Sequence, residues 1–409
     1  MQQQSGGDKK LLSGRRPTKS LTGRPSEAAI LVSIDFGESD YSESLDELRL
    51  LAETAGVRTV AVVEARRQRP DAALFAGSGK VQEIAELVER LEAPLVIFNH
   101  DLSPAQMRNL TTGLNTRVID RTMLILDIFA QRAQSHEGKV QVELAQLKYL
   151  AARLVGQGAD MGQQKFAVGA RGPGETRLEL DRRKLDKRVH LLKERLEKLK
   201  HQRVIQRRAR NRHDVLSVSI VGYTNAGKST LFNRLTRANV YVADQLFATL
   251  DTTSRRMFIE DASGSSPDKG RPGGVGEIVV SDTVGFIRHL PHSLVAAFRS
   301  TLEETVQADL LLHVVDANNA NRDDQIAEVN KVLFEIGAAD IPQVLVFNKI
   351  DLQDVTPSVQ RDDYGRIARV FLSAKSGAGL DGLKLALMEA KTLRQTPAAV
   401  ENQINQASE

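Results

Sequence analysis

A short stretch in the second half of the chain has the residue types and spacing needed to bind phosphate groups. It follows the pattern G-x-x-x-x-G-K-[ST] and consists of Gly222, Tyr223, Thr224, Asn225, Ala226, Gly227, Lys228, Ser229 and Thr230. An alternating apolar run precedes it at 216–221 and a helix-like run follows at 231–235, which is the context of a P-loop. Its glycines let backbone N–H groups face phosphate oxygens, and the helix start adds a positive dipole end. Lys228 is then placed for the β- and γ-phosphates and Ser229 for Mg2+.

Two later segments have residues that can read a nucleobase. The first follows the apolar run 344–347 and consists of Asn348, Lys349, Ile350 and Asp351. A carboxylate at Asp351 accepts hydrogen bonds from guanine N1–H and its exocyclic amine, which adenine does not offer. We expect Asn348 to tie this loop to the P-loop and the Lys349 stem to cover the base. The second segment is Ser373, Ala374 and Lys375, where Ser373 and the Ala374 N–H are expected to hold guanine O6. The bound nucleotide is therefore predicted to be GTP.

Between the P-loop and the base-reading segments lie residues suited to sensing the γ-phosphate and its metal ion. Asp282, Thr283, Val284 and Gly285 follow a predicted strand, where the aspartate reaches Mg2+ through water and the glycine N–H reaches the γ-phosphate. Before them stand Phe247, Ala248, Thr249, Leu250 and Asp251. We predict that Thr249 binds Mg2+ and the γ-phosphate, with Thr252 and Thr253 as competitors, so that this segment is ordered by GTP and released by GDP. The predicted catalytic residues are Lys228, Thr249 and Gly285; the predicted metal ligands are Ser229, Thr249 and Asp282.

The residue after Gly285 is unusual for this chemistry. Many GTPases have a glutamine there that orients the attacking water, whereas this chain has Phe286. A phenyl ring cannot orient water as an amide does. We therefore expect slow intrinsic hydrolysis, with the water positioned by a partner or by the substrate.

The region before the P-loop is predicted to form a second α/β unit. Its apolar pattern predicts strands at 28–34, 59–63, 95–98 and 118–119, alternating with helices at 45–55, 81–91, 104–114 and 123–133. Strands that alternate with helices favour a parallel sheet covered by helices.

A helical pair is predicted between the two α/β units. Apolar residues recur with helical spacing over 140–154, and a second helix has a heptad pattern in Leu178, Leu185, Val189, Leu192, Leu196 and Leu199. Two such helices should pack as an antiparallel hairpin. The loop between them, 156–175, holds six glycines, and Arg171 within it and Arg177 just beyond it suit phosphate contacts.

The charge distribution predicts a polyanionic partner. The 409-residue chain has a net charge of +4, yet residues 177–213 hold fifteen Lys/Arg and five Asp/Glu, and residues 1–25 hold six Lys/Arg and one Asp. Two basic segments on an otherwise acidic protein are typical of nucleic-acid binding; the alternative is a solvated helix face and a floppy tail. The absence of cysteine excludes disulfides and thiolate chemistry, and no apolar run is long enough to cross a bilayer. We expect a cytoplasmic monomer without a signal peptide.

Several of these segments resemble the HflX family of GTPases. The resemblance rests on 221–233 (VGYTNAGKSTLFN), 282–289 (DTVGFIRH), 171–183 (RGPGETRLELDRR) and the stretch from Ile119 to Phe129. It implies a GTPase that binds the large ribosomal subunit and splits stalled ribosomes under heat stress. It also implies that the N-terminal domain and the hairpin dock on ribosomal RNA, with the glycine-rich loop near the peptidyl-transferase centre. This chain departs from the family at Thr252, where relatives often have proline, and at 262–274, which looks like an insertion.

The predicted fold class is therefore α/β, with a P-loop GTPase domain and an N-terminal parallel α/β domain joined by an antiparallel helical hairpin. The expected divisions are a disordered basic tail (1–25), the N-terminal domain (26–135), the hairpin with a basic linker at 205–214 (136–214), the GTPase domain (215–393) and a polar C-terminal tail (394–409). Two other functions fit the motifs: an ATP- or GTP-driven enzyme that remodels ribosomal RNA, and an RNA-binding module with a vestigial nucleotide site. Asp351 argues against a preference for ATP, and the intact Lys228, Ser229, Asp282 and Asn348 argue against a vestigial site.

Overall fold

The N-terminal unit is a parallel sheet with helices on both faces. In the computed structural model, which describes residues 27–38, 40–154, 173–210, 215–238, 246–259, 276–288, 294, 302–353 and 355–406, the sheet has the order β2-β1-β3-β4. Its elements in chain order are β1 (Ala28–Asp35), α1 (Tyr41–Thr54), β2 (Arg58–Arg66), α2 (Ser78–Leu91), β3 (Leu95–Phe98), α3 (Pro104–Leu114), β4 (Arg117–Asp120) and α4 (Arg121–Arg132). All three strand pairs are parallel, as the alternation of strands and helices predicted.

Side-chain alternation along the strands builds two cores on this sheet. Ala29 and Leu31 pack with Leu48 of α1 and residues of α4 on one face. Ile30 and Val32 pack on the other face with apolar side chains of α2 and α3. Successive residues of a strand point to opposite faces, so the continuous apolar run of β1 reflects burial on both sides.

The GTPase unit is a larger, mixed sheet. Its strands have the order β10-β11-β9-β8-β5-β7-β6, and only the two edge strands are antiparallel to their neighbours. The strands are β5 (Leu216–Gly222), β6 (Thr253–Ile259), β7 (Gly276–Asp282), β8 (Leu310–Asp316), β9 (Gln343–Asn348), β10 (Ser358–Arg361) and β11 (Ile367–Phe371). The helices are α8 (Lys228–Thr236), α10 (Glu303–Val306), α11 (Arg322–Ile336) and α12 (Leu380–Gln406), with a 3-10 turn η2 at Ile350–Leu352. The α/β fold class with a P-loop domain is confirmed.

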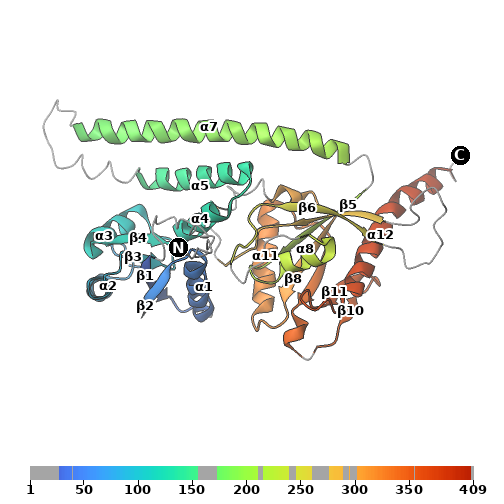
Figure 1. Ribbon diagram of the computed structural model, residues 1–409, viewed down its shortest axis with the longest axis horizontal. Helices are drawn as coiled ribbons and strands as arrows, with labels where there is room; N and C mark the ends of the chain where they lie inside the picture. Colours follow the sequence, from blue (N-terminus) through green and yellow to red (C-terminus); the bar gives the residue numbers. More distant parts are fainter. Residues whose placement is uncertain are drawn as a thin grey trace, which may run out of the picture.

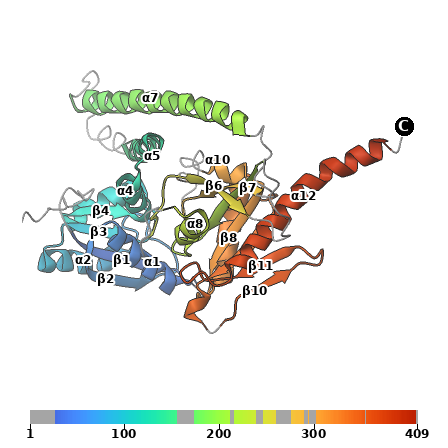
Figure 2. The same cartoon turned by 45° about the vertical axis from the view of Figure 1, so that its right-hand side comes forward.

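Helix α5 (His136–Leu154) and the long helix α7 (Pro173–Arg210) lie side by side above the N-terminal unit, and α7 extends further towards the GTPase unit (Figure 1 and Figure 2). Val140 and Leu144 of α5 pack against Leu192 and Leu196 of α7, two of the heptad positions. Arg188 on α7 pairs with Glu143 on α5 at 2.7 Å. The chain runs along α5 in one direction and returns along α7 in the other (Figure 1).

The two α/β units share one apolar cluster. Phe129 of α4 and Phe247 of the GTPase unit meet edge to face, with ring centroids 4.7 Å apart. Leu246, Leu250 and Phe286 are buried in the same cluster as the core of the N-terminal unit. An aromatic pair of this kind contributes about 0.5–1.5 kcal/mol beyond its buried area. The segment expected to sense the γ-phosphate is thus anchored on the N-terminal unit.

Among the boundaries that differ from expectation, two concern whole segments. Helix α7 continues to Arg210 through the segment interpreted as a basic linker, because residues 205–210 contain helix formers and no glycine or proline. Helix α12 likewise passes the expected start of a polar tail at 394 and ends at Gln406. The N-terminal tail (1–25), the segment 156–172 with Arg171, and the insertion at 262–274 lie outside the described residues. Within the described residues, no helix has the length and apolarity needed for a bilayer span.

Candidate nucleotide-binding site

The P-loop joins the end of β5 to the first residue of α8. Gly227 precedes the helix in a left-handed conformation (φ 94°), and a Cβ at this position would lie 2.2 Å from Asn348 Nδ2. Only glycine fits there. No side chain caps the start of α8, so the first-turn amides face the space where a phosphate would bind.

Lys228 is buried at this helix start, with 6% of its surface exposed. Its Nζ donates to the backbone oxygen of Tyr223 at 2.6 Å. Burial lowers the pKa of Lys228 to about 8, although the nearby Asp282 carboxylate opposes this shift. An ammonium buried in this way gains from an anionic ligand, which suits a phosphate contact.

Three oxygen-bearing side chains meet beside the lysine. Ser229 Oγ donates to Asp282 Oδ2 at 2.8 Å and lies 2.7 Å from Thr249 Oγ1. Burial raises the pKa of Asp282, against hydrogen bonds from Ser229 and Thr249 that lower it. Among the described atoms, Asp282 Oδ1 is buried without a hydrogen-bond partner. Two hydroxyls and one carboxylate with a free oxygen are hard donors that fit Mg2+, which completes its octahedron with water and substrate phosphates.

These contacts distinguish two of the three candidate threonines. Thr249 reaches Ser229, whereas Thr253 begins β6 and pairs with Asp282 through the backbone ladder. The geometry therefore favours Thr249 over Thr253 as a metal ligand.

The loop after β9 is tied to the P-loop by Asn348. Its Nδ2 donates to Ala226 O at 2.8 Å, and its Oδ1 accepts from Ala374 N at 2.9 Å. Lys349 pairs with Asp316 at 2.7 Å, and Asp351 stands exposed at the rim of the cavity. This arrangement leaves the Asp351 carboxylate accessible to a base.

Ser373 and Ala374 differ from the expectation for guanine O6. The Ala374 N–H donates to Asn348, and the fully buried Ser373 accepts from Ser376 N at 3.1 Å. In this structure the Ala374 N–H and the Ser373 hydroxyl both take part in hydrogen bonds within the protein, and of the two residues only Ala374 lines the cavity.

One cavity of about 410 Å3 collects most of the predicted residues. It is lined by Thr224, Asn225, Gly227, Lys228, Ser229, Thr230, Phe247, Ala248, Thr249, Thr283, Gly285, Asn348, Lys349, Asp351, Ala374 and Lys375, and by Leu352, which the sequence did not suggest. The predicted residues that do not line it are Gly222, Tyr223, Ala226, Leu250, Asp251, Asp282, Val284, Ile350 and Ser373. Of these, Asp282 contacts Ser229, which lines the cavity, and Tyr223 and Asp251 contact the N-terminal part of the chain.

Comparisons with known proteins show which family the chain resembles. Three families match consecutive segments: "GTP-binding GTPase N-terminal" over 42–130, "GTP-binding GTPase Middle Region" over 132–210, and "50S ribosome-binding GTPase" over 217–349. A protein of Escherichia coli K12 named GTPase HflX is 53% identical over 364 residues, which cover 89% of this chain and 82% of the relative. A GTPase HflX of Caldanaerobacter subterraneus is 46% identical, covering 91% of this chain and 82% of the relative.

The chain belongs to the HflX family of GTPases. It binds GTP and hydrolyses it to GDP and phosphate. A solved GTP-binding protein from Sulfolobus solfataricus in complex with GDP is 24% identical, with a TM-score of 0.46, and the match covers 90% of this chain and 99% of that protein.

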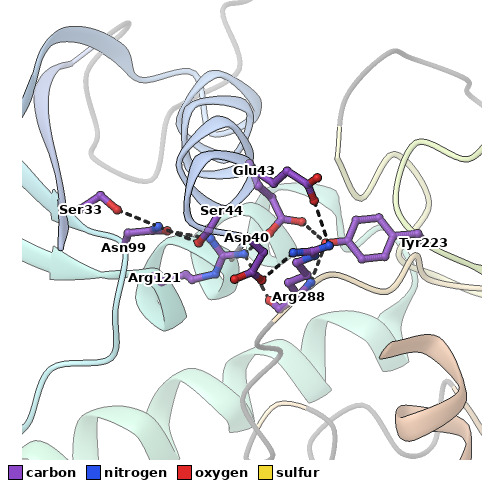
Figure 3. A network of polar contacts seen from close by, with 9 residues as sticks. Ser33, Asp40, Glu43, Ser44, Asn99, Arg121, Tyr223 and Arg288 are labelled. Carbon is purple, nitrogen blue, oxygen red and sulfur yellow. Dashed lines mark hydrogen bonds and ion pairs between the residues drawn. The ribbon is translucent and has the colours of Figure 1, made fainter. Parts of the chain in front are cut away.

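A buried polar network in this HflX-family chain was not foreseen from the sequence. Figure 3 shows it between helix α1 and the GTPase unit. Tyr223 of the P-loop donates its hydroxyl to Glu47 of α1 and accepts from Arg288 N at 2.8 Å. Arg288 pairs with Asp40 at 2.5 Å and with Glu43 at 2.9 Å. Burial, followed by the nearby Glu47 charge, raises the pKa of Tyr223. The only signal in the sequence was the i, i+4 spacing of Glu43 and Glu47, which places both on one face of α1.

Asp251 forms a second link between the two parts. Its carboxylate accepts from Gln134 N and Ser135 N, both at 2.8 Å, and from Ser135 Oγ at 2.6 Å. Ser135 in turn accepts from Gly138 N at 2.8 Å and so caps the start of α5. Asp251, predicted to contact the nucleotide, thus holds the first turn of a hairpin helix.

Proposed function

We propose that this protein binds the large ribosomal subunit in its GTP-bound form and splits or rescues stalled ribosomes, notably under heat stress, as a monomer in the cytoplasm. Membership in the HflX family and the match of 217–349 to the family described as 50S ribosome-binding GTPase support the proposal. The observation that carries it is the contact of Asp251 with Ser135, because it joins the nucleotide site to the basic hairpin.

The hairpin supplies a surface suited to ribosomal RNA. Its apolar seam is used in packing, since Leu192 and Leu196 are buried against α5. Arg182, Arg183 and Lys187 are exposed on α7. Exposed cations on a helix suit phosphate contacts, which dominate the affinity of proteins for nucleic acid.

The segment from Thr249 to Asp251 links the bound nucleotide to the helical hairpin. Thr249 contacts the Ser229–Asp282 pair. Asp251, two residues later, accepts a hydrogen bond from Ser135, the residue that caps α5. Ser229, Asp282 and Thr249 are the side chains that would hold Mg2+, which when bound neutralises charge that develops on the phosphates. With GTP bound, Thr249 is fixed and Asp251 stays on α5. Loss of the γ-phosphate frees Thr249, and the segment can leave α5.

The test is ribosome binding by a variant with a neutralised α7 surface. Arg182→Gln, Arg183→Gln and Lys187→Gln together keep the helix propensity and remove three cations. Arg188 is left unchanged because it pairs with Glu143. A matched control carries Lys331→Gln, Arg366→Gln and Lys384→Gln, three exposed cations of the GTPase unit. The proposal predicts weaker binding of large subunits by the first variant only, with the slope of log affinity against log salt reduced by about 2 to 3. Equal affinities and slopes in the two variants would contradict it.

A further inference from the structure

The residue in the usual place of a water-orienting glutamine cannot perform that role. The Phe286 side chain is 1% exposed and lies in the apolar cluster shared by the two units. Its backbone is fixed as well: Phe286 N donates to Gly222 O at 3.1 Å, and Phe286 O accepts from Thr224 N at 2.7 Å. If the protein itself supplies a group that orients the attacking water, that group must therefore be another residue of the cavity wall.

Thr224 has a hydroxyl that the protein itself does not use. The residue is 6% exposed, and its Oγ1 is buried with no hydrogen-bond partner among the described residues. A buried hydroxyl without a partner is destabilising, because it has lost its contacts with water. Such a group is typical of a site where a ligand or a water molecule completes the hydrogen bond.

The position of Thr224 is that of a residue beside the γ-phosphate. A Cβ built on Gly285 would lie 2.8 Å from Thr224 Cγ2 and 2.9 Å from Lys228 Nζ. The three residues therefore surround one small region of the nucleotide cavity, which all of them line. Gly285 is the residue expected to touch the γ-phosphate through its N–H.

Thr224 also borders a second space. Together with Asn225 and Tyr223 it lines a cleft of about 250 Å3 against α1, whose wall includes Glu43, Glu47 and Arg288. Part of the polar network of Figure 3 contributes to this wall. Charged side chains around a cleft of this size favour ordered water, so Thr224 stands between a hydrated cleft and the reacting phosphate.

We propose that the Thr224 hydroxyl orients the attacking water, in the role that a glutamine has in many GTPases. Thr224 Oγ1 accepts a hydrogen bond from a water molecule that enters from the α1 cleft and directs its lone pair at the γ-phosphorus. A bond forms between the water oxygen and phosphorus while the bond to the β–γ bridging oxygen breaks, and that oxygen keeps the electron pair in GDP. The water proton passes to a γ-phosphate oxygen, which gives inorganic phosphate. The proposal rests on GTP hydrolysis at this site and not on ribosome binding.

The test compares Thr224→Val with Thr224→Ser in the full chain, without ribosomes. Single-turnover GTP hydrolysis is measured with excess protein, and the affinity for a non-hydrolysable GTP analogue is measured separately. Valine has the shape of threonine without the hydroxyl, so hydrolysis should slow by about tenfold or more while analogue affinity stays within about threefold. Serine keeps the hydroxyl and should retain most of the rate.

Stability gives an independent readout. Because Thr224 Oγ1 has no partner within the described chain, Thr224→Val should melt at the same temperature as the wild type or higher. Thr224→Ala also lacks the hydroxyl and should show the same loss of rate if the valine variant does not fold. A wild-type rate in the valine variant would overturn the proposal. Equal losses in the valine and serine variants, or equal losses of rate and analogue affinity, would also overturn it.

Discussion

Removing the Asp251 carboxylate should make the start of α5 open more often, and the hydrogen bonds that are lost set the size of this effect. Asp251→Ala deletes three hydrogen bonds, two of them from the backbone amides of Gln134 and Ser135. Hydrogen bonds to a partly exposed carboxylate contribute about 1 to 2 kcal/mol, which corresponds to about a 5- to 30-fold change in a local equilibrium. Amide hydrogen exchange at Gln134, Ser135 and Gly138 should accelerate by this factor in the free protein. Asp381→Ala, which removes an exposed acid on α12, is the control.

A second substitution tests whether Asp251 itself causes the effect. A Cβ at Gly138 would lie 2.1 Å from Asp251 Oδ1, so Gly138→Ala should displace the carboxylate and speed exchange at Gln134 and Ser135. In the Asp251→Ala background the 2.1 Å contact is absent and only the 3.0 Å approach of the Cβ to Ser135 Oγ remains, so Gly138→Ala should change the exchange much less than in the wild type. Unchanged exchange in Asp251→Ala, or the same effect of Gly138→Ala in both backgrounds, would refute the reasoning.

Three further outcomes follow from the site and its surroundings. Asp351→Asn exchanges an acceptor for a donor at the cavity rim and should shift the preference from GTP towards xanthosine triphosphate; wild-type GTP affinity in competition binding would contradict the guanine assignment. Lys228→Ala should abolish nucleotide binding without changing the thermal unfolding of the N-terminal unit. Nucleotide-binding and melting curves measured on the same sample check both parts. Burial raises the pKa of Asp127 on α4 to about 6, above the ordinary value of 3.8, so its protonation favours the fold, and that stability is lost as the pH rises through about 6. Asp127→Asn should therefore raise the free energy of unfolding by about 3 kcal/mol above that pH and hardly at all below about pH 4. Denaturant unfolding of both proteins at several pH values measures this difference. A stabilisation that does not grow as the pH rises would contradict the raised pKa of Asp127.

The elements that carry local signals were predictable from the sequence. Strand β3 and helix α3 have the predicted bounds, because an apolar run flanked by turn residues and a Ser-Pro helix start are local features. The P-loop was predictable for the same reason, since its glycines and lysine act within one turn of chain. Asn348 was correctly expected to reach the P-loop, because the two strand ends of a parallel sheet lie at one edge.

The contacts between the two α/β units were not predictable from the sequence alone. Tyr223 and Glu47 are 176 residues apart, and Ser135 and Asp251 are 116 apart. No sequence spacing predicts either contact, because the relative placement of two packed units depends on their whole surfaces. The same limit explains why Asp251 was expected to contact the nucleotide: its neighbour Thr249 faces the cavity, and only the packing of α5 directs the aspartate elsewhere.

Sedimentation with ribosomes tests the central claim most directly. The full chain is mixed with intact ribosomes or purified large subunits in the presence of GDP or a non-hydrolysable GTP analogue, and the fractions are assayed for protein and for free subunits. We predict that the chain travels with large subunits when the analogue is present and is mostly unbound with GDP, and that intact ribosomes are converted to subunits only with the analogue. Equal co-sedimentation in the two nucleotide states, or none in either, would contradict the account.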